Sequence, residues 1–205
     1  NALFQRALKT ETFRQALDAA VEDLKAYLSP ERINAMAEEY SAIIKPYLYR
    51  MPDVQYAPLT ETEYDSIVSG LNAEIQNNYD AYYESYLKPM PFYIDTPRVQ
   101  DGKMVYTWNS AYDFDAETIT YTFELARDYT FANPLIKQEG LLIPDIKGDK
   151  LPAGQYFIRV TAENASGYQQ YAFDYYTIDS GKVYGTKCFY VMEDGTIVED
   201  VYEEG

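Results

Sequence analysis

Three acidic side chains stand at alternate positions in this 205-residue sequence, namely Asp113, Asp115 and Glu117. Alternating carboxylates in a loop are one way to collect the oxygen ligands that Ca²⁺ prefers. The stretch does not continue into a twelve-residue calcium loop, so we favour a solvated turn whose Asp side chains bond their own backbone. A calcium site formed by these three residues is the alternative.

Tyrosine is the second group of interest, with 23 copies in the chain. Its ring offers rigid apolar area, and its hydroxyl can bind a partner or water. Four of these residues lie close together at Tyr79, Tyr82, Tyr83 and Tyr86. At helical spacing Tyr79, Tyr82 and Tyr86 share one face, which we expect to pack inward. Tyr83 is then the expected exposed member and the candidate for stacking on a glycan or protein ligand.

Several kinds of catalysis are excluded by what the sequence lacks. It contains no His, so triad hydrolases and His-ligated metal centres are ruled out. Its single Cys188 lies in an apolar run, where a buried thiol is expected, and no disulfide within the chain can form. No Gly-rich phosphate-binding loop precedes a helix. We therefore assign no catalytic residue and no cofactor to this chain.

The charge of the chain bounds its partners. A formal net charge of −16 repels a phosphate backbone, so nucleic acid is not an expected ligand. No apolar run reaches the ~18 residues of a membrane-spanning helix, so we expect no membrane insertion. The sequence starts at Asn1 without Met, from which we expect a piece of a longer protein. The glycosylation triplet Asn164-Ala165-Ser166 receives no weight because such triplets are frequent by chance.

An apolar period of three to four residues predicts three helices in the first part of the chain. The first begins after Thr10, and the second at Ser29-Pro30, where Ser29 caps and Pro30 takes the first helical position. After a loop at 51–59, the third begins at Thr60, which fits a capping box with Glu63. The three apolar stripes, which we expect to face a core, consist of Phe13, Leu17, Val21, Leu24 and Leu28, of Ile33, Met36, Tyr40, Ile43, Tyr47 and Leu48, and of Tyr64, Ile67, Val68, Leu71, Ile75, Tyr79, Tyr82 and Tyr86.

From Phe92 the apolar period changes to two, which predicts strands. Apolar and polar residues alternate along 118–125 and along 156–163. Strands with one apolar face close most naturally as an antiparallel sandwich. The dipeptide Asp194-Gly195 predicts an additional hairpin that ends at Val201.

The segment 151–164 begins with Leu151-Pro152, continues through Tyr156 and is closed by Gly167. It resembles the corner and following strand of fibronectin type III domains, in which a leucine and a tyrosine bracket the corner. Trp108 matches the buried tryptophan of that family. The resemblance covers about residues 91–176 and implies that Trp108, Leu151 and Tyr156 are core residues between two sheets.

Four short motifs mark the first helices, namely Leu3-Phe4, Phe13-Arg14, Leu28-Ser29-Pro30-Glu31-Arg32 and Ile44-Lys45-Pro46. Their order and spacing resemble the final helices of spore coat protein H (CotH) kinase-like domains. That family phosphorylates protein substrates with bound nucleotide and metal, and its catalytic motifs lie upstream of these helices. The resemblance therefore implies a secreted or surface bacterial protein of which this chain is a non-catalytic part.

The sequence thus predicts an α+β chain with two domains. Residues 1–90 form a helical bundle of three helices that ends a CotH-like domain. Residues 91–205 form an antiparallel fibronectin III- or immunoglobulin-like β-sandwich with an extra C-terminal hairpin. The expected role is an extracellular or cell-surface scaffold or binding module, whose partners are the upstream part of the same polypeptide and a protein or glycan ligand. The alternatives are an accessory part of an atypical protein kinase and a carbohydrate-binding module.

Overall fold

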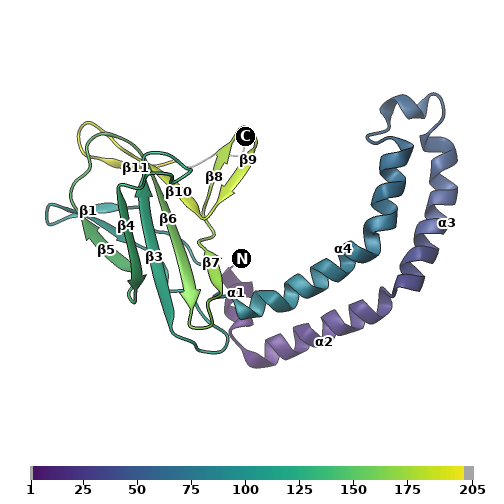
Figure 1. The fold of residues 1–205 in the computed structure, drawn as a ribbon, viewed down its shortest axis with the longest axis horizontal. Helices are drawn as coiled ribbons and strands as arrows, with labels where there is room; N and C mark the ends of the chain where they lie inside the picture. Colours follow the sequence, from purple (N-terminus) through teal and green to yellow (C-terminus); the bar gives the residue numbers. More distant parts are fainter. Residues whose placement is uncertain (1, 201–205) are drawn as a thin grey trace. The chain divides into compact units, whose positions relative to one another are not determined.

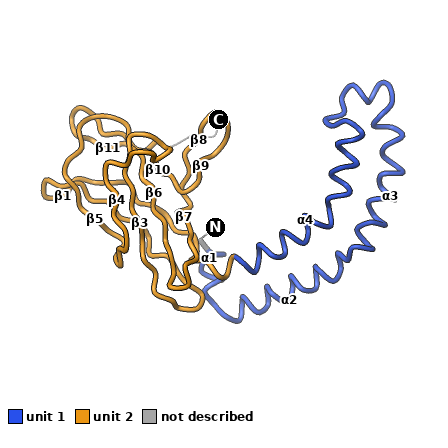
Figure 2. The backbone as a smooth tube through the Cα atoms, in the orientation of Figure 1, with its two compact units in different colours: residues 1–84 blue, residues 85–205 orange. Residues whose placement is uncertain are grey.

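The computed structural model describes residues 2–200 and divides the chain into two compact units, residues 1–84 and residues 85–205 (Figure 2). We call them the helical unit and the sandwich unit. Residues 1 and 201–205, which include the predicted end of the hairpin at Val201, lie outside the described residues. The predicted α+β class is confirmed, since helices precede a set of antiparallel sheets (Figure 1).

The described part of the chain contains four α-helices, one more than the sequence predicted. They are α1 (Ala2–Leu8), α2 (Glu11–Tyr27), α3 (Pro30–Leu48) and α4 (Glu61–Leu87), and the 3-10 helix η1 (Asp53–Tyr56) lies in the predicted loop. The additional helix is α1, which is too short to show a helical period in the sequence. None of the described helices combines the length and the apolar character that a bilayer-crossing segment requires.

The helix starts follow the predicted capping residues. Ser29 Oγ accepts a hydrogen bond from the Arg32 N–H at 3.4 Å. At the start of α4 the Glu63 N–H donates to Thr60 Oγ1 at 3.3 Å, and the Thr60 N–H donates to Glu63 Oε2 at 2.8 Å. Thr10 occupies the N-cap position of α2, although its side chain makes no capping hydrogen bond. Local sequence therefore determines where these helices begin.

Within the helical unit, α4 runs antiparallel beside α3 and then α2 (Figure 1). The polar contacts along α4 meet partners in the reverse order of the chain, as antiparallel pairing requires. They are Asp65 with Lys45 at 2.7 Å, Asn72 with Asn34 at 2.7 Å, and Tyr82 with Asp18 at 2.7 Å.

The predicted apolar stripes of these helices are half-buried at most. No described residue of α2, α3 or α4 is buried. Leu24, Ile43 and Ile67 remain 56%, 58% and 55% exposed. Two helical layers cover only the seam at which they meet, whereas an enclosed core needs a further element over the open face.

The sandwich unit contains two antiparallel sheets that share one core. The smaller sheet has the order β1 (Arg98–Gln100), β2 (Lys103–Thr107) and β5 (Asp145–Gly148). The larger has the order β11 (Ile197–Glu199), β10 (Thr186–Val191), β6 (Gly154–Asn164), β3 (Ile119–Ala126) and β4 (Ile136–Leu141), and β7 (Gln169–Tyr171) also pairs with β6. The predicted hairpin is β10–β11, which belongs to the larger sheet. A separate ribbon, β8 (Tyr175–Ile178) with β9 (Gly181–Tyr184), was not predicted.

Aromatic rings fill the core of the sandwich. Trp108 is 3% exposed and stacks on Phe123, with ring centroids 5.9 Å apart. Tyr156 has no exposed surface and stacks on Phe189 at 5.6 Å. Both belong to the same apolar cluster, and Leu151 packs against it. These three residues therefore lie where the fibronectin-type resemblance implies.

The corner before β6 is held by the Tyr156 hydroxyl, which donates to the Pro152 carbonyl oxygen at 2.7 Å. This is the tyrosine corner of such sandwiches, in which the hydroxyl bonds backbone a few residues upstream. The Arg127 guanidinium covers the Tyr156 ring at 4.2 Å from its centroid. Gly154 has a φ of +147°, a backbone conformation that favours glycine, and an added Cβ would displace the Arg127 guanidinium.

We expect Tyr156→Phe to lower the unfolding free energy of the sandwich by about 1 kcal/mol, because it removes one net hydrogen bond and leaves the buried ring in place. Urea unfolding followed by the fluorescence of Trp108, the single tryptophan, measures the change. Tyr184→Phe, on a side chain that is 67% exposed, is the matched control. Equal stability of the two variants would contradict a stabilising corner.

Candidate functional site

The three alternating carboxylates form a turn that bonds itself. Asp113 is buried, and its Oδ1 accepts the backbone N–H groups of Asp115 and Glu117, each at 3.0 Å. The Glu117 carboxylate is used by Ser166, whose N–H and hydroxyl both donate to it. Among residues 2–200, no group of three or more His, Cys, Asp or Glu side chains is placed to hold a metal ion. The geometry therefore favours the turn over the calcium site.

Asn164 is the centre of this loop network. Its Nδ2 donates to the Leu87 carbonyl oxygen and to Asp113 Oδ2, both at 2.9 Å, and its Oδ1 accepts the Tyr168 N–H at 2.9 Å. The side chain is buried, at 6% exposure. It occupies the glycosylation triplet of the sequence, but an amide nitrogen that is enclosed and twice bonded is not available for a glycan. Its role is to bind the end of α4 and the Asp113 turn to β6.

The surroundings of Asp113 favour its ionised form. Burial by itself raises the pKa of this carboxyl, but the hydrogen bonds from Asn164 and from the backbone of Glu117 and Asp115 outweigh it, and the pKa lies below its ordinary value. The folded state then binds this proton less readily than the unfolded state. The stabilisation is complete above the unfolded pKa and is lost as the pH falls through the folded pKa.

Cys188 is buried as predicted. Burial raises the pKa of its thiol to about 12. A thiol with this pKa stays protonated at neutral pH, so it is a packing residue and not a nucleophile.

The clustered tyrosines of α4 bind the side chain of one glutamate. The hydroxyls of Tyr79 and Tyr83 both donate to Glu22 Oε1 at 2.6 Å. The ring of Tyr83 contacts those of Tyr79 and Tyr82, with centroids 5.1 and 5.0 Å apart. The hydrogen bonds from the two hydroxyls lower the pKa of Glu22, and the bond to Glu22 raises the pKa of Tyr83.

Tyr83 was predicted to be the exposed member of this cluster, and that prediction is wrong. Its side chain is half-buried, like those of Tyr79 and Tyr82. The helical period placed it off the apolar stripe, but a glutamate on α2 faces it across the helix pair. Because Glu22 is distant in the sequence, the local pattern held no signal of this contact.

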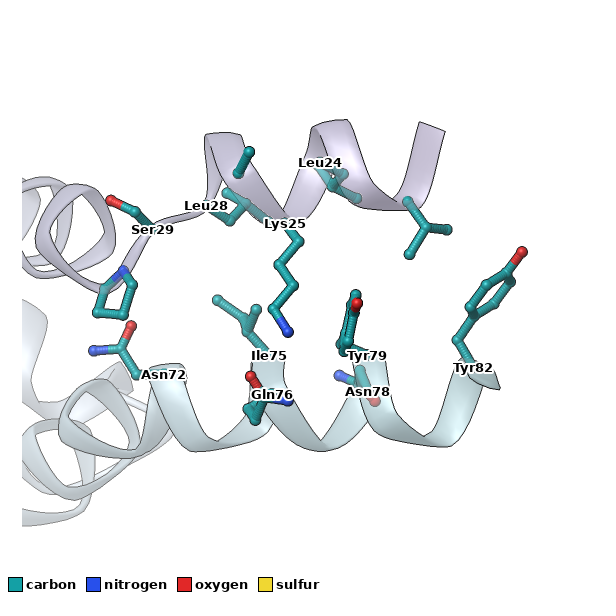
Figure 3. Close-up of a pocket in the computed structure, with 13 residues that line it drawn as sticks. Leu24, Lys25, Leu28, Ser29, Asn72, Ile75, Gln76, Asn78, Tyr79 and Tyr82 are labelled. Carbon is teal, nitrogen blue, oxygen red and sulfur yellow. The ribbon is translucent and has the colours of Figure 1, made fainter. Parts of the chain in front are cut away.

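An apolar groove of the helical unit lies beside these tyrosines, between the α2–α3 junction and α4 (Figure 3). This helical groove has a volume of about 480 Å³. Leu24 and Leu28 border it on one side and Ile75 and Tyr79 on the other (Figure 3). Lys25 reaches into it, with Nζ 3.2 Å from the Tyr79 ring centroid, a cation–π contact. The sequence identified the apolar members as stripe residues, but the groove depends on the spacing of two helices.

Comparison with known families concerns the same helices. Residues 1–82 match the family model described as CotH kinase protein. We call residues 1–82 the CotH-like segment, because they are similar to this family. The match confirms the resemblance seen in the first helices and extends it into α4. The CotH-like segment therefore contains the helical groove and the tyrosine cluster.

One similar solved structure is the twitchin kinase region from C. elegans (Fn31-NL-kin-CRD-Ig26). The identity is 19%, the match covers 48% of this chain and 20% of that chain, and the TM-score is 0.30. No curated protein matches the chain.

We expect Asn164→Ala to lower the unfolding free energy of the sandwich by about 2 kcal/mol, because a buried carboxylate and a carbonyl lose their donor. Urea unfolding followed by Trp108 fluorescence measures it. The control is Ser180→Ala, an exposed position in the turn between β8 and β9, at which a change of less than about 0.5 kcal/mol is expected. If both variants lose the same stability, the network around Asn164 does not hold the loops together.

The depressed pKa of Asp113 predicts a specific acid response. The wild-type unfolding free energy should fall as the pH drops below about 3.9, the ordinary aspartate value. Asp113→Asn cannot take up this proton, so its stability should change less over the same pH range. Unfolding curves of both proteins at several pH values between neutrality and strong acid compare the slopes. Parallel slopes would show that Asp113 titrates normally.

Proposed function

We propose that this chain is a non-catalytic scaffold and binding part of a CotH-like protein. In this proposal the helical unit completes a kinase-like domain, and the sandwich unit binds a partner. The observation that carries it is the absence of any buried residue in the described parts of α2, α3 and α4, together with the family match over these helices.

The exposed apolar face of the helical unit supports the proposal that a further part of the protein packs against it. Large apolar side chains such as Leu24, Ile43 and Ile67 are more than half exposed. Burying one of them stabilises a fold by about 1.5–3 kcal/mol. The occupant we propose is the preceding part of the same polypeptide, since the helices match a kinase family and carry no phosphate-binding loop of their own. This occupant would cover the groove and the adjoining stripes.

The chemistry of the helical unit supports a structural role. The acidic side chains that face α4, Asp18 and Glu22, accept hydrogen bonds from the tyrosine hydroxyls of α4. Lys25 lies over the Tyr79 ring. These charged groups bond the two helices to each other, and in this proposal they take no part in holding nucleotide or Mg²⁺. If the parent protein is an active atypical kinase, this chain is an accessory to that activity.

The family also bears on location. The CotH family is named after a spore coat protein, and we propose an extracellular or cell-surface location in a bacterium for the parent protein on this basis.

Hydrogen exchange tests the missing layer directly. In a longer protein that restores the preceding residues, the amides of α2, α3 and α4 should exchange about 100-fold more slowly than in this chain, equivalent to about 2.7 kcal/mol of added local stability. In that protein Ile43→Glu should reverse the protection, whereas Glu39→Gln on the same helix should not. The layer does not exist if these helices are already as protected as β3 and β6 in the present chain.

Calorimetric titration with Mg-ATP tests the catalytic assignment. We expect no binding heat with this chain and binding with the longer protein. Binding by this chain would show that the non-catalytic assignment is wrong. If neither protein binds, the scaffold role stands and the accessory-kinase alternative fails.

A further inference from the structure

The sandwich unit has a hollow of its own, of about 460 Å³, beside β8 and the β10–β11 hairpin. Four aromatic residues line it, Tyr93, Phe173, Tyr175 and Tyr176. Three acidic residues line it as well, Asp174, Glu199 and Asp200, together with Lys187. We call it the aromatic-acidic hollow. Aromatic rings and carboxylates that line one hollow can together bind a cation.

Three of the four aromatic residues of the hollow are exposed to solvent, whereas Tyr176 is half-buried. Tyr93, Phe173 and Tyr175 are 42%, 54% and 39% exposed. The rings of Tyr93 and Phe173 have centroids 5.5 Å apart and planes inclined at 58°. Because their planes are inclined, the two rings do not form one flat surface. The Tyr175 ring already holds one ammonium group, that of Lys182, with Nζ 4.0 Å from its centroid.

The side chains at the base of the hollow are held by hydrogen bonds and carry excess negative charge. The Lys187 side chain is 9% exposed, and its Nζ contacts Asp174 Oδ1 at 3.3 Å and Glu199 Oε1 at 2.5 Å. Asp174 Oδ2 accepts the Ile94 N–H at 2.8 Å, and Thr96 Oγ1 donates to Glu199 Oε2. These bonds fix the two carboxylates in place. One lysine among three lining acids leaves the hollow negatively charged.

Asp200 is the acidic group of the hollow that remains most accessible. It is exposed, whereas Asp174 and Glu199 are half-buried. A charge at this position can pair with an incoming cation without first breaking the bonds of Lys187. The adjacent faces of Tyr93 and Phe173 then supply the apolar and π contacts for the stem and head of a long basic side chain.

We propose that the aromatic-acidic hollow binds a lysine or arginine side chain from a basic segment of a partner protein. The proposal rests on the binding role proposed above for the sandwich unit and names the chemistry of the partner. Charge complementarity carries it, because the hollow is negative and the chain has a formal net charge of −16. Electrostatic attraction brings a basic segment to the surface, and the tilted rings select the side chain that enters.

Calorimetric titration of this chain with a lysine-rich peptide tests the proposal, with the same peptide carrying acetylated lysines as the neutral comparison. We expect the charged peptide to bind and the acetylated one not to. Phe173→Ala and Tyr93→Ala should each weaken binding about fivefold, the equivalent of one lost cation–π contact. Asp200→Asn should weaken it about threefold and reduce its dependence on salt.

Tyr168→Ala is the matched control, since Tyr168 is also an exposed aromatic at 39% but does not line the hollow. Trp108 fluorescence shows that each variant is folded. The proposal is overturned if the acetylated peptide or a neutral oligosaccharide binds as well as the charged peptide, or if the two aromatic variants bind like the control. Either result leaves the hydrogen-exchange test of the helical layer unaffected, so the two proposals fail separately.

Discussion

The sandwich depends on the enclosure of strand β6. This strand pairs with β3 on one side and with β10 on the other, and Tyr156, Ile158 and Val160 on it have no exposed surface. The tyrosine corner sets where β6 begins, and Asn164 at its other end bonds the Asp113 turn and the end of α4. Because both ends of β6 are anchored by hydrogen bonds of buried side chains, the loops around it have defined positions.

The aromatic-acidic hollow follows from the same framework. Lys187 lies on β10, the strand paired with β6, and Glu199 lies on β11, the strand paired with β10. Asp174 reaches the pair from the segment before β8, where its second oxygen is bound by the Ile94 N–H. A buried lysine that is bonded by two carboxylates would be costly if either were lost. The two ion pairs therefore hold Lys187 and both carboxylates in place at the base of the hollow.

The helical unit obeys a different constraint. Its helices are well capped and are joined by polar contacts, yet none of its described helical residues in α2, α3 or α4 is buried. A cap contributes about 0.5–2 kcal/mol and a side-chain pair about 0.2–0.5 kcal/mol, whereas the main stabilisation of helices in proteins comes from packing an apolar face. Such a unit would gain most stability from an additional layer over its open apolar face. The CotH-like match and the open groove therefore both support the proposed scaffold role.

The sequence by itself determined the features that depend on neighbouring residues. The change of apolar period located the helices and strands, Ser29, Thr60 and Glu63 marked two helix starts, and the corner motif around Tyr156 identified the sandwich. Only the tertiary structure decided which side chains meet, such as Glu22 with Tyr83, Asp113 with Asn164, and Lys187 with Asp174. The short helix α1 and the β8–β9 ribbon also became evident only there. The physical reason is that a periodic pattern reports which face of an element is apolar, but the partner across that face is set by the packing of segments that lie far apart in the chain.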